Sequence, residues 1–316
     1  MKRSLVLIAL LLCVLIAACG NNGPASSVKP SGSPEPTASP PESAPAAAET
    51  SEAGFMFTPE NIPRLDGSTA TIPLISAVRS VLLGIPREND VKVSGTDNAY
   101  TQLIEGNVDL LLVYAPAQSS LDYAKAQGVE LELAPIGKDA LVFLVNVKNP
   151  VKSLTPEQLV AIYSGETTNW KDVGGVDAGI LAYQRQLVSG SQTMMNKLVM
   201  KGTPMADAPA EYVIGEMGGL VDAVAVYDGA ENAIGYNVYY YVSRMKLDEN
   251  IRLLEVGGVA PSTETITSGA YPFVNDFYAV IRSDAPEDSP ARLLFNWMLT
   301  EEGQQLVAHE GYATAK

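Results

Sequence analysis

The sequence predicts an α/β fold with mainly parallel sheets, carried by about 260 residues that follow an apolar leader and a polar spacer. Two observations lead to this fold class. Short apolar runs alternate along the chain with longer segments of helical periodicity. The run over 108–114 is largely apolar, which is typical of a strand covered on both faces. In such sheets ligands bind beyond the carboxyl ends of the strands, so the turns after the strands are candidate sites.

The leader combines a basic start, Met1-Lys2-Arg3, with an apolar run over 5–18. This run is shorter than the roughly 20 residues that a membrane-spanning helix needs, and it is typical of a secretory signal. It ends in Ala17-Ala18-Cys19, which resembles the lipobox of bacterial lipoproteins. We therefore expect a signal peptide over 1–18, cleavage before Cys19 and a diacylglycerol on the Cys19 thiol. The alternatives are an ordinary signal peptide with an incidental cysteine and, less favoured by the length, a transmembrane anchor.

The cysteine count agrees with lipidation. The chain has two cysteines, and Cys13 would leave with the signal peptide. Cys19 would then be the only cysteine of the mature chain, so no internal disulfide is possible although export usually permits one. Acylation gives this cysteine a purpose, and two acyl chains provide the durable anchoring that one chain does not.

A polar spacer follows over 19–54, rich in Pro, Ser, Ala, Gly, Thr and Glu. Such a composition buries too little apolar surface to offset its ordering entropy, so we expect a disordered tether. The net charge is −15, and loss of Lys2 and Arg3 changes it to −17. An acidic surface argues against nucleic-acid partners and against electrostatic adhesion to anionic lipids. It does not exclude a small anion held locally by backbone N–H groups.

The elements of the folded part can be placed in chain order. Pro73 stands in the first turn of the first expected helix, where proline is tolerated, and Thr155-Pro-Glu-Gln is a capping signal for a later helix. Helices are expected over 71–83, 98–105, 119–126, 155–163, 192–200, 220–227, 290–299 and 302–309. Strands are expected over 91–94, 108–114, 131–136, 141–147, 180–183, 233–236 and 277–281.

Three segments share a design suited to anions: a strand, a Gly/Ser/Thr-rich turn, and the start of a helix, where free N–H groups and a positive helix end meet. They are Asp66-Gly67-Ser68-Thr69-Ala70-Thr71-Ile72-Pro73-Leu74, Ser94-Gly95-Thr96-Asp97-Asn98-Ala99 and Arg185-Gln186-Leu187-Val188-Ser189-Gly190-Ser191-Gln192-Thr193. The third adds a guanidinium, which can hold an oxyanion in a bidentate fork. The commoner interpretation of each turn alone is an ordinary helix cap, and Arg185 alone would more often be a surface ion-pair residue. Their joint occurrence favours an anion site.

From this point the chain resembles the PstS-type phosphate-binding subunits of bacterial ABC importers, which are periplasmic binding proteins. The most specific match is Tyr163-Ser164-Gly165-Glu166-Thr167-Thr168-Asn169-Trp170-Lys171-Asp172-Val173-Gly174-Gly175. Moderate matches are Asp66-Gly67-Ser68-Thr69 with Ile72-Pro73-Leu74, the stretch from Arg185 to Gln192, Ala233-Ile234-Gly235-Tyr236, and Glu302-Gly303-Gln304 through Gly311-Tyr312. They run in the family's order from about residue 64 to the end of the sequence.

The resemblance implies two α/β lobes joined by crossing strands, over 55–142 with 258–316 and over 143–257. It implies one phosphate or related tetrahedral oxyanion between the lobes, an ABC permease and ATPase as partners, no cofactor and no catalysis. The extracytoplasmic face of the cell membrane is the expected location, and a monomer is the expected state. The implied ligand-binding residues are Ser68, Thr69, Ala70, Thr71, Thr96, Tyr114, Arg185, Ser189, Gly190 and Ser191.

Two positions depart from the family pattern. Tyr114 stands where the family places an acidic residue that accepts a hydrogen bond from protonated phosphate and so rejects fully deprotonated anions. A phenol can accept or donate, so phosphate binding remains possible, but rejection of sulfate by charge does not follow. Leu187 stands where the family often has an acid that pairs with the arginine, so we expect a less negative site and a less tightly held Arg185.

The rest of the sequence offers little for other chemistry. No spaced His/Cys/Asp/Glu cluster predicts a metal site, and no Ser–His–Asp or Cys–His set predicts a nucleophile. His309 is expected on a helix surface, Trp170 in an interlobe or subdomain seam, and 237–241 in strand packing. Two competing functions stay open: a sensor or other non-transport lipoprotein that uses Tyr114 for a different ligand, and a hydrolase of phosphate esters, against which the missing metal cluster counts.

Overall fold

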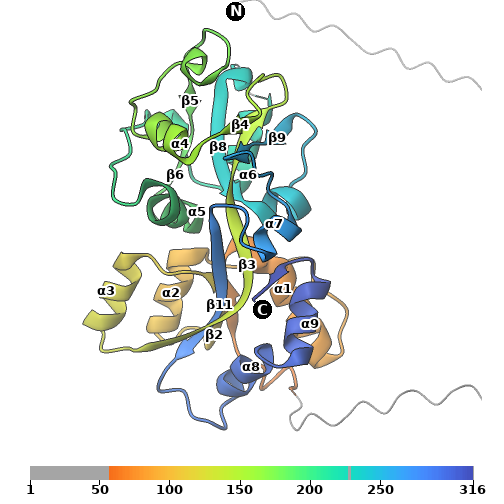
Figure 1. Cartoon of the computed structure of the whole chain (residues 1–316). Helices are drawn as coiled ribbons and strands as arrows, with labels where there is room; N and C mark the ends of the chain where they lie inside the picture. Colours follow the sequence, from red (N-terminus) through yellow and green to blue (C-terminus); the bar gives the residue numbers. More distant parts are fainter. Residues whose placement is uncertain (1–56, 227–228, 316) are drawn as a thin grey trace, which may run out of the picture. The chain divides into compact units, whose positions relative to one another are not determined.

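A computed structural model describes residues 57–226 and 229–315 of the chain. It confirms the α/β class: two lobes, each a sheet flanked by helices, are joined by strands that run through both (Figure 1). The expected signal peptide, the lipidated Cys19 and the tether lie outside the described residues. Within those residues, no helix is long and apolar enough to cross a membrane, and no cluster of acidic, His or Cys side chains could hold a metal ion.

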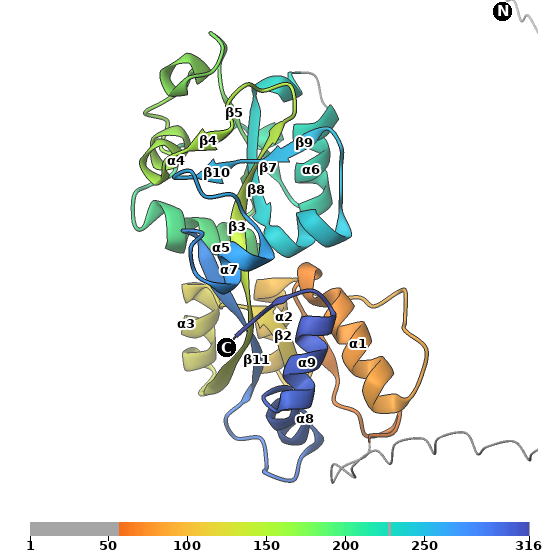
Figure 2. The same ribbon diagram turned by 45° about the vertical axis from the view of Figure 1, so that its right-hand side comes forward.

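Lobe 1 is built on strands from distant parts of the chain. β1 (Leu65–Gly67) pairs in parallel with β2 (Leu110–Tyr114), and β2 pairs antiparallel with β11 (Val274–Arg282). The helices of this lobe are α1 (Ile72–Leu83), α2 (Thr96–Ile104), α3 (Gln118–Ala126), α8 (Pro290–Met298) and α9 (Glu301–His309). Figure 2 shows them gathered around the lower end of β3 and β11. His309 is exposed on α9, as expected.

Lobe 2 is centred on β8 (Ala233–Val238), which is buried along its whole length and pairs in parallel with β5 (Leu181–Ala182). Its other strands are β4 (Ser153–Leu154), β6 (Gln184–Arg185), β7 (Val213–Ile214), β9 (Ile251–Leu253) and β10 (Glu255–Val256). Its helices are α4 (Pro156–Tyr163), α5 (Gly190–Met194) and α6 (Met217–Val226), and α7 (Thr263–Thr267) lies where the two lobes join (Figure 2). Trp170 is fully buried in this lobe and donates its indole N–H to the carbonyl of Asn232 at 2.8 Å.

One strand, β3 (Leu131–Asn146), belongs to both lobes, and this corrects the expectation of two separate strands over 131–136 and 141–147. Its first part pairs with β11 and with β12 (Ala313–Thr314), and its last part pairs with β8 and β9. The Gly137-Lys138-Asp139 stretch, which lies between the two expected strands, continues the strand through a register shift opposite Phe277 and Tyr278. A side chain at 137 would lie 2.4 Å from the Phe277 ring, so glycine is required there by close packing. Because the crossing strands run antiparallel to their neighbours, the sheet is mixed.

The prediction of a strand over 91–94 is wrong. This segment has no ladder partner, and the Ser94 N–H donates instead to the Asp66 carboxylate at 2.7 Å. Two helices begin earlier than expected: α2 at Thr96 instead of 98, and α6 at Met217 instead of 220. The helix expected over 192–200 begins at Gly190 and continues from Met195 to Met200 in the wider π form. The capping box at Thr155 is confirmed, since Thr155 and Gln158 exchange backbone-to-side-chain hydrogen bonds.

Candidate functional site

The first ligand loop follows β1 and is held by the Asp66 carboxylate. This carboxylate accepts hydrogen bonds from the N–H groups of Gly67 and Ser94, both at 2.7 Å, and so fixes two loops relative to each other. A side chain at Gly67 would overlap the carbonyl of Leu112 on β2, at 2.0 Å, so only glycine lets the loop approach the strand this closely. The result places the buried Ser68 hydroxyl at the end of the sheet.

Two of the expected ligand residues are used inside the protein instead. The Thr71 hydroxyl is fully buried and donates to the carbonyl of Leu112 at 2.6 Å, next to the carbonyl of Ser68 at 2.8 Å. Ala70 is also fully buried, and its carbonyl accepts the hydroxyl proton of Tyr312 at 2.7 Å. Neither residue lines the cleft described below, so their side chains support the loop on the side away from the cleft.

The second loop brings Thr96 beside Ser68. Gly95, with φ of 84°, takes the left-handed conformation that starts α2 at Thr96. The Ser68 and Thr96 hydroxyls lie 2.8 Å apart, and the Tyr114 N–H donates to the Ser68 oxygen at 3.2 Å. Two hydroxyls from different loops therefore converge on one point of the lobe 1 wall.

Arg185 supplies the cation from lobe 2. Its backbone N–H donates to the Tyr236 hydroxyl at 3.0 Å, which ties β6 to the central strand of the lobe. The residue is 5% exposed, yet its Nε and Nη1 have no hydrogen-bond partner among the described residues, and no carboxylate there forms an ion pair with it. Burial lowers the pKa of the guanidinium. Leu187 is 79% exposed and uncharged, so position 187 supplies no acidic partner for Arg185.

The turn after Arg185 completes the lobe 2 wall. The Ser189 hydroxyl caps α5 by accepting the N–H of Gln192 at 3.2 Å. The Ser191 hydroxyl is buried without a partner among the described residues. Gly190 lies close to lobe 1: a Cβ built on it would be 2.4 Å from the Thr96 hydroxyl oxygen. The lobes therefore already meet on one side of the site.

Between these walls lies a cleft of about 470 Å³. Eight of the ten expected residues line it: Ser68, Thr69, Thr96, Tyr114, Arg185, Ser189, Gly190 and Ser191. Arg185 and Glu216 are the charged residues along this cleft in the part of the chain that the structure describes. An anion between the lobes would meet one buried guanidinium, several hydroxyls and the starts of α2 and α5.

Tyr114 lines the cleft, but its hydroxyl is committed elsewhere. It donates to the Asp139 carboxylate at 2.6 Å, inside the protein. Burial raises the pKa of Asp139 to about 6, although the hydrogen bonds from Tyr114 and from backbone N–H groups lower it. Burial and then the Asp139 charge raise the pKa of Tyr114 well above its usual value, so the phenol stays protonated. The Asp139 carboxylate does not line the cleft itself and faces it only through Tyr114.

A further part of the cleft wall was not predicted from the sequence. Gly215 and Glu216 line the cleft from the turn after β7, and Met217 and Gly218 line it from the start of α6. Tyr241 lies close by, with its hydroxyl 3.2 Å from a Cβ built on Gly218. The Gly-Glu-Met-Gly-Gly run is the signal that could have found this turn, since it repeats the strand–glycine–helix design. The two residues of β7 were too few to reveal it. Tyr241 was assigned to strand packing, whereas it belongs to the short helix after β8.

The geometry can now be set beside known proteins. A family model described as PBP superfamily domain matches residues 64–302. The chain is 25% identical over 265 residues to the phosphate-binding protein PstS of Borreliella burgdorferi, which covers 81% of this chain and 91% of that protein. It is 26% identical over 253 residues to PstS of Bacillus subtilis, with 78% and 79% covered.

Solved structures agree on the fold. One is a putative phosphate ABC transporter substrate-binding protein with bound phosphate from Clostridium perfringens, with a TM-score of 0.60, 26% identity, and 80% of this chain and 98% of that chain covered. An ABC-type phosphate transport receptor from Vibrio cholerae has a TM-score of 0.59 at 22% identity, with 79% and 98% covered. Since the family model spans well over half of the sequence, the chain belongs to the family of the PBP superfamily domain.

Proposed function

We propose that the folded part captures inorganic phosphate or a related tetrahedral oxyanion between its lobes and delivers it to an ABC permease and its ATPase. The observation that carries the proposal is Arg185, a nearly buried guanidinium that forms no ion pair with a carboxylate of the described residues. Burying an unpaired charge is costly, and an anion in the cleft would remove that cost. The phosphate-binding relatives support the choice of ligand.

Each wall would contribute a different kind of contact. The Arg185 fork would take two anion oxygens, and the Ser191 hydroxyl, which lacks a partner, would take a third. The Ser68 oxygen already accepts the Tyr114 N–H, so its own proton is free for Thr96 or for the anion. Binding would bring the two lobes further together around the ion. No bond is made or broken in this proposal.

Titration calorimetry of the purified full-length protein tests the ligand. We expect phosphate to bind, with sulfate, methylphosphonate and molybdate as the comparison anions. Because the wall at Tyr114 carries no free carboxylate, we expect sulfate to compete measurably with phosphate. If the folded protein binds none of the four anions, the proposed function is wrong.

We further propose that the lipid on Cys19 holds this receptor at the outer face of the cell membrane, with residues 19–54 as its tether. The leader and the lone mature cysteine support this placement. The tether would let the folded part reach a permease in the same membrane.

A further inference from the structure

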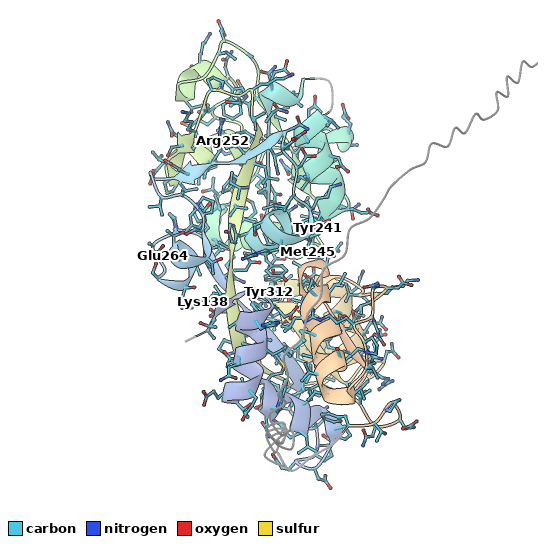
Figure 3. All side chains as sticks on the ribbon, turned by 90° about the vertical axis from the view of Figure 1, so that its right-hand side faces the viewer. Lys138, Tyr241, Met245, Arg252, Glu264 and Tyr312 are labelled. Carbon is cyan, nitrogen blue, oxygen red and sulfur yellow. The ribbon has the colours of Figure 1, made fainter. Side chains whose placement is uncertain are left out.

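Asp139 occupies the point where β3 passes from one lobe to the other. Its register partner is Asn275 on β11, whereas Leu141, two residues later, pairs with Val238 on β8. Figure 3 labels its neighbour Lys138 together with Tyr312 at the level where the lobes join. Asp139 is 2% exposed, so its carboxylate is buried at the point where β3 passes between the lobes.

This carboxylate holds groups from both lobes. One oxygen accepts the hydroxyl proton of Tyr114, at 2.6 Å, and Tyr114 lines the lobe 1 wall of the cleft. The other oxygen accepts the N–H of Ala140 at 2.7 Å and the N–H of Tyr240, which follows β8 of lobe 2, at 3.1 Å. A single side chain thus links the cleft wall to the neighbouring lobe.

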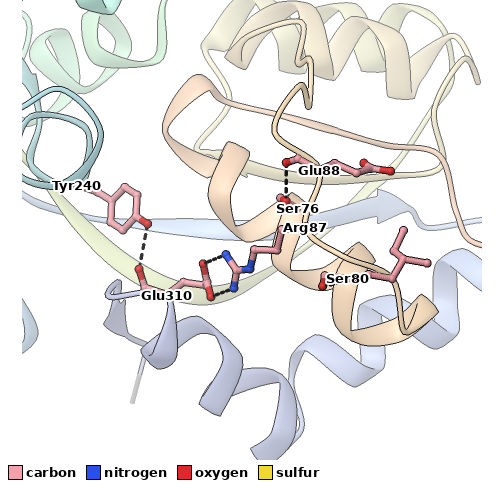
Figure 4. A network of polar contacts seen from close by, with 7 residues as sticks. Ser76, Ser80, Arg87, Glu88, Tyr240 and Glu310 are labelled. Carbon is pink, nitrogen blue, oxygen red and sulfur yellow. Dashed lines mark hydrogen bonds and ion pairs between the residues drawn. The ribbon is translucent and has the colours of Figure 1, made fainter. Parts of the chain in front are cut away.

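A second path joins the same residues to the first ligand loop. Tyr240 stacks on Tyr312, with ring centroids 3.6 Å apart, and Tyr312 donates to the carbonyl of Ala70 beside Ser68. Tyr240 also donates its hydroxyl to the carbonyl of Glu310 at 2.9 Å, and the Glu310 carboxylate pairs with Arg87 (Figure 4). The region around Asp139 is therefore connected to the cleft from two directions.

No cation compensates Asp139 in the part of the chain that the structure covers. The titratable groups packed against it are three phenols: Tyr114 from β2, Tyr240 from the segment after β8 and Tyr312 from the turn before β12. Asn275 faces it from β11, and the Lys138 ammonium is directed to the carbonyl of Thr267 at 3.4 Å. An asparagine or an apolar residue would cost less in such a place, so the charge calls for a role other than stability.

We propose that Asp139 is a positioning residue for the anion cleft, whose ionised carboxylate holds Tyr114 and the lobe 2 backbone in the arrangement that binds the anion. The proposal rests on the proposed function and adds its regulation: the cleft loses affinity when Asp139 takes up a proton. The pKa of about 6 puts this change between pH 5 and 7.

The test compares Asp139→Asn with the wild type by phosphate calorimetry from pH 5 to 8. Taking the ratio of the two dissociation constants at each pH cancels the ionisation of phosphate itself. We expect the variant to bind at least tenfold more weakly at pH 8 and the ratio to approach one at pH 5, where the wild type has lost the same charge. Tyr114→Phe should weaken binding at pH 8, and the double variant should be no weaker than the weaker single variant, because both remove one interaction.

Asp276→Asn, the same change on the adjacent crossing strand β11, is the matched control and should leave the ratio near one at every pH. A merely structural role would lower the unfolding temperature of Asp139→Asn at pH 8 in parallel with its affinity, whereas we expect an unfolding temperature no lower than that of the wild type. A pH-independent ratio, or an affinity within twofold of the wild type at pH 8, overturns the proposal. If the wild type binds no oxyanion, the proposed function fails, and the unfolding comparison alone decides whether Asp139 is structural.

Discussion

Arg185 is buried like a core residue but charged like a surface residue, and this conflict predicts two opposite effects of replacing it. Arg185→Met should weaken phosphate binding at least a hundredfold, because it removes the fork and the charge. The same change should raise the free energy of unfolding without ligand by about 1–4 kcal/mol, since an unpaired buried charge is replaced by an apolar side chain. Calorimetry and denaturant unfolding measure the two effects.

Arg185→Lys is the matched control for that prediction, because it keeps the charge and loses the planar fork. We expect an affinity between those of the wild type and Arg185→Met. Loss of binding together with loss of stability in Arg185→Met would instead mean that the guanidinium supports the fold.

Asp139 predicts a pH dependence of stability with a definite sign. Its pKa in the folded state, about 6, lies above the ordinary 3.8, so the folded state binds the proton more tightly than the unfolded state does. The contribution of Asp139 to stability is therefore greatest at low pH and is lost as the pH rises from about 4 to about 6. The full difference is roughly 3 kcal/mol at 1.36 kcal/mol per pKa unit.

Asp139→Asn removes this titration. The free energy of unfolding of the variant minus that of the wild type should therefore increase between pH 4.5 and pH 8, by roughly 2–3 kcal/mol. Urea unfolding at the two pH values gives the difference. A decrease over the same range would show that the hydrogen bonds to the carboxylate outweigh its burial.

Among single residues, the sequence predicted the polar side chains that stand in Gly/Ser/Thr-rich turns. Ser68 follows β1, Thr96 begins α2 and Arg185 ends β6, so each stands at a strand end or a helix start, where free N–H and hydroxyl groups are expected at one edge. Asp139 could not be found in this way, since a lone acid inside a strand has no local pattern. Its partner Tyr114 is 25 residues away, and only the assembled sheet brings the two together.

Among the elements, the start of α5 sets how closely the lobes can approach. The Cβ of an alanine at 190 would lie 2.4 Å from the Thr96 hydroxyl oxygen and 3.2 Å from the Thr96 Cβ, so the lobes would have to move apart. We expect Gly190→Ala to weaken phosphate binding at least tenfold and to leave the fold intact, because φ at 190 is not in the left-handed range. Calorimetry measures the affinity, and the radius of gyration with saturating phosphate reports closure.

Gly179→Ala serves as the control for this experiment, since a Cβ there would meet its nearest neighbour only at 4.0 Å. It should bind and close like the wild type. Unchanged affinity in Gly190→Ala would show that the contact between Gly190 and Thr96 does not limit closure.

Elements were predictable when they were long and periodic. The helices α1, α4, α8 and α9 lie within a residue or so of their expected bounds, because their apolar periodicity and caps are local. The two-residue strands β4, β6, β7, β10 and β12 carry no periodicity and exist because a distant partner is present. β3 was not predicted as one strand for the same reason, because its continuation through Gly137-Lys138-Asp139 depends on pairing with the distant β11 across a register shift.

For the whole molecule, the expected anchor makes a prediction that is independent of the ligand. Cys19→Ala should abolish incorporation of labelled palmitate and move the protein from the membrane fraction to the medium or periplasm, while phosphate affinity stays within twofold of the wild type. Cys13→Ala is the control and should behave like the unmodified chain, since that residue would leave with the signal peptide. Continued membrane retention of Cys19→Ala would show that something other than the lipid anchors the chain.

The shared strands also decide when this protein can fold. β2 ends at Tyr114, and its antiparallel partner β11 begins at Val274, so 274 − 114 = 160 positions of chain must be made before the two can pair. β3 ends at Asn146, so it waits 274 − 146 = 128 positions for β11 and 313 − 146 = 167 positions for β12. A chain emerging from the ribosome therefore cannot complete lobe 1 early, and such non-local pairing is slow once it begins. If the chain is exported as proposed above, this delay is an advantage, because lobe 1 cannot be completed until most of the chain has been synthesised.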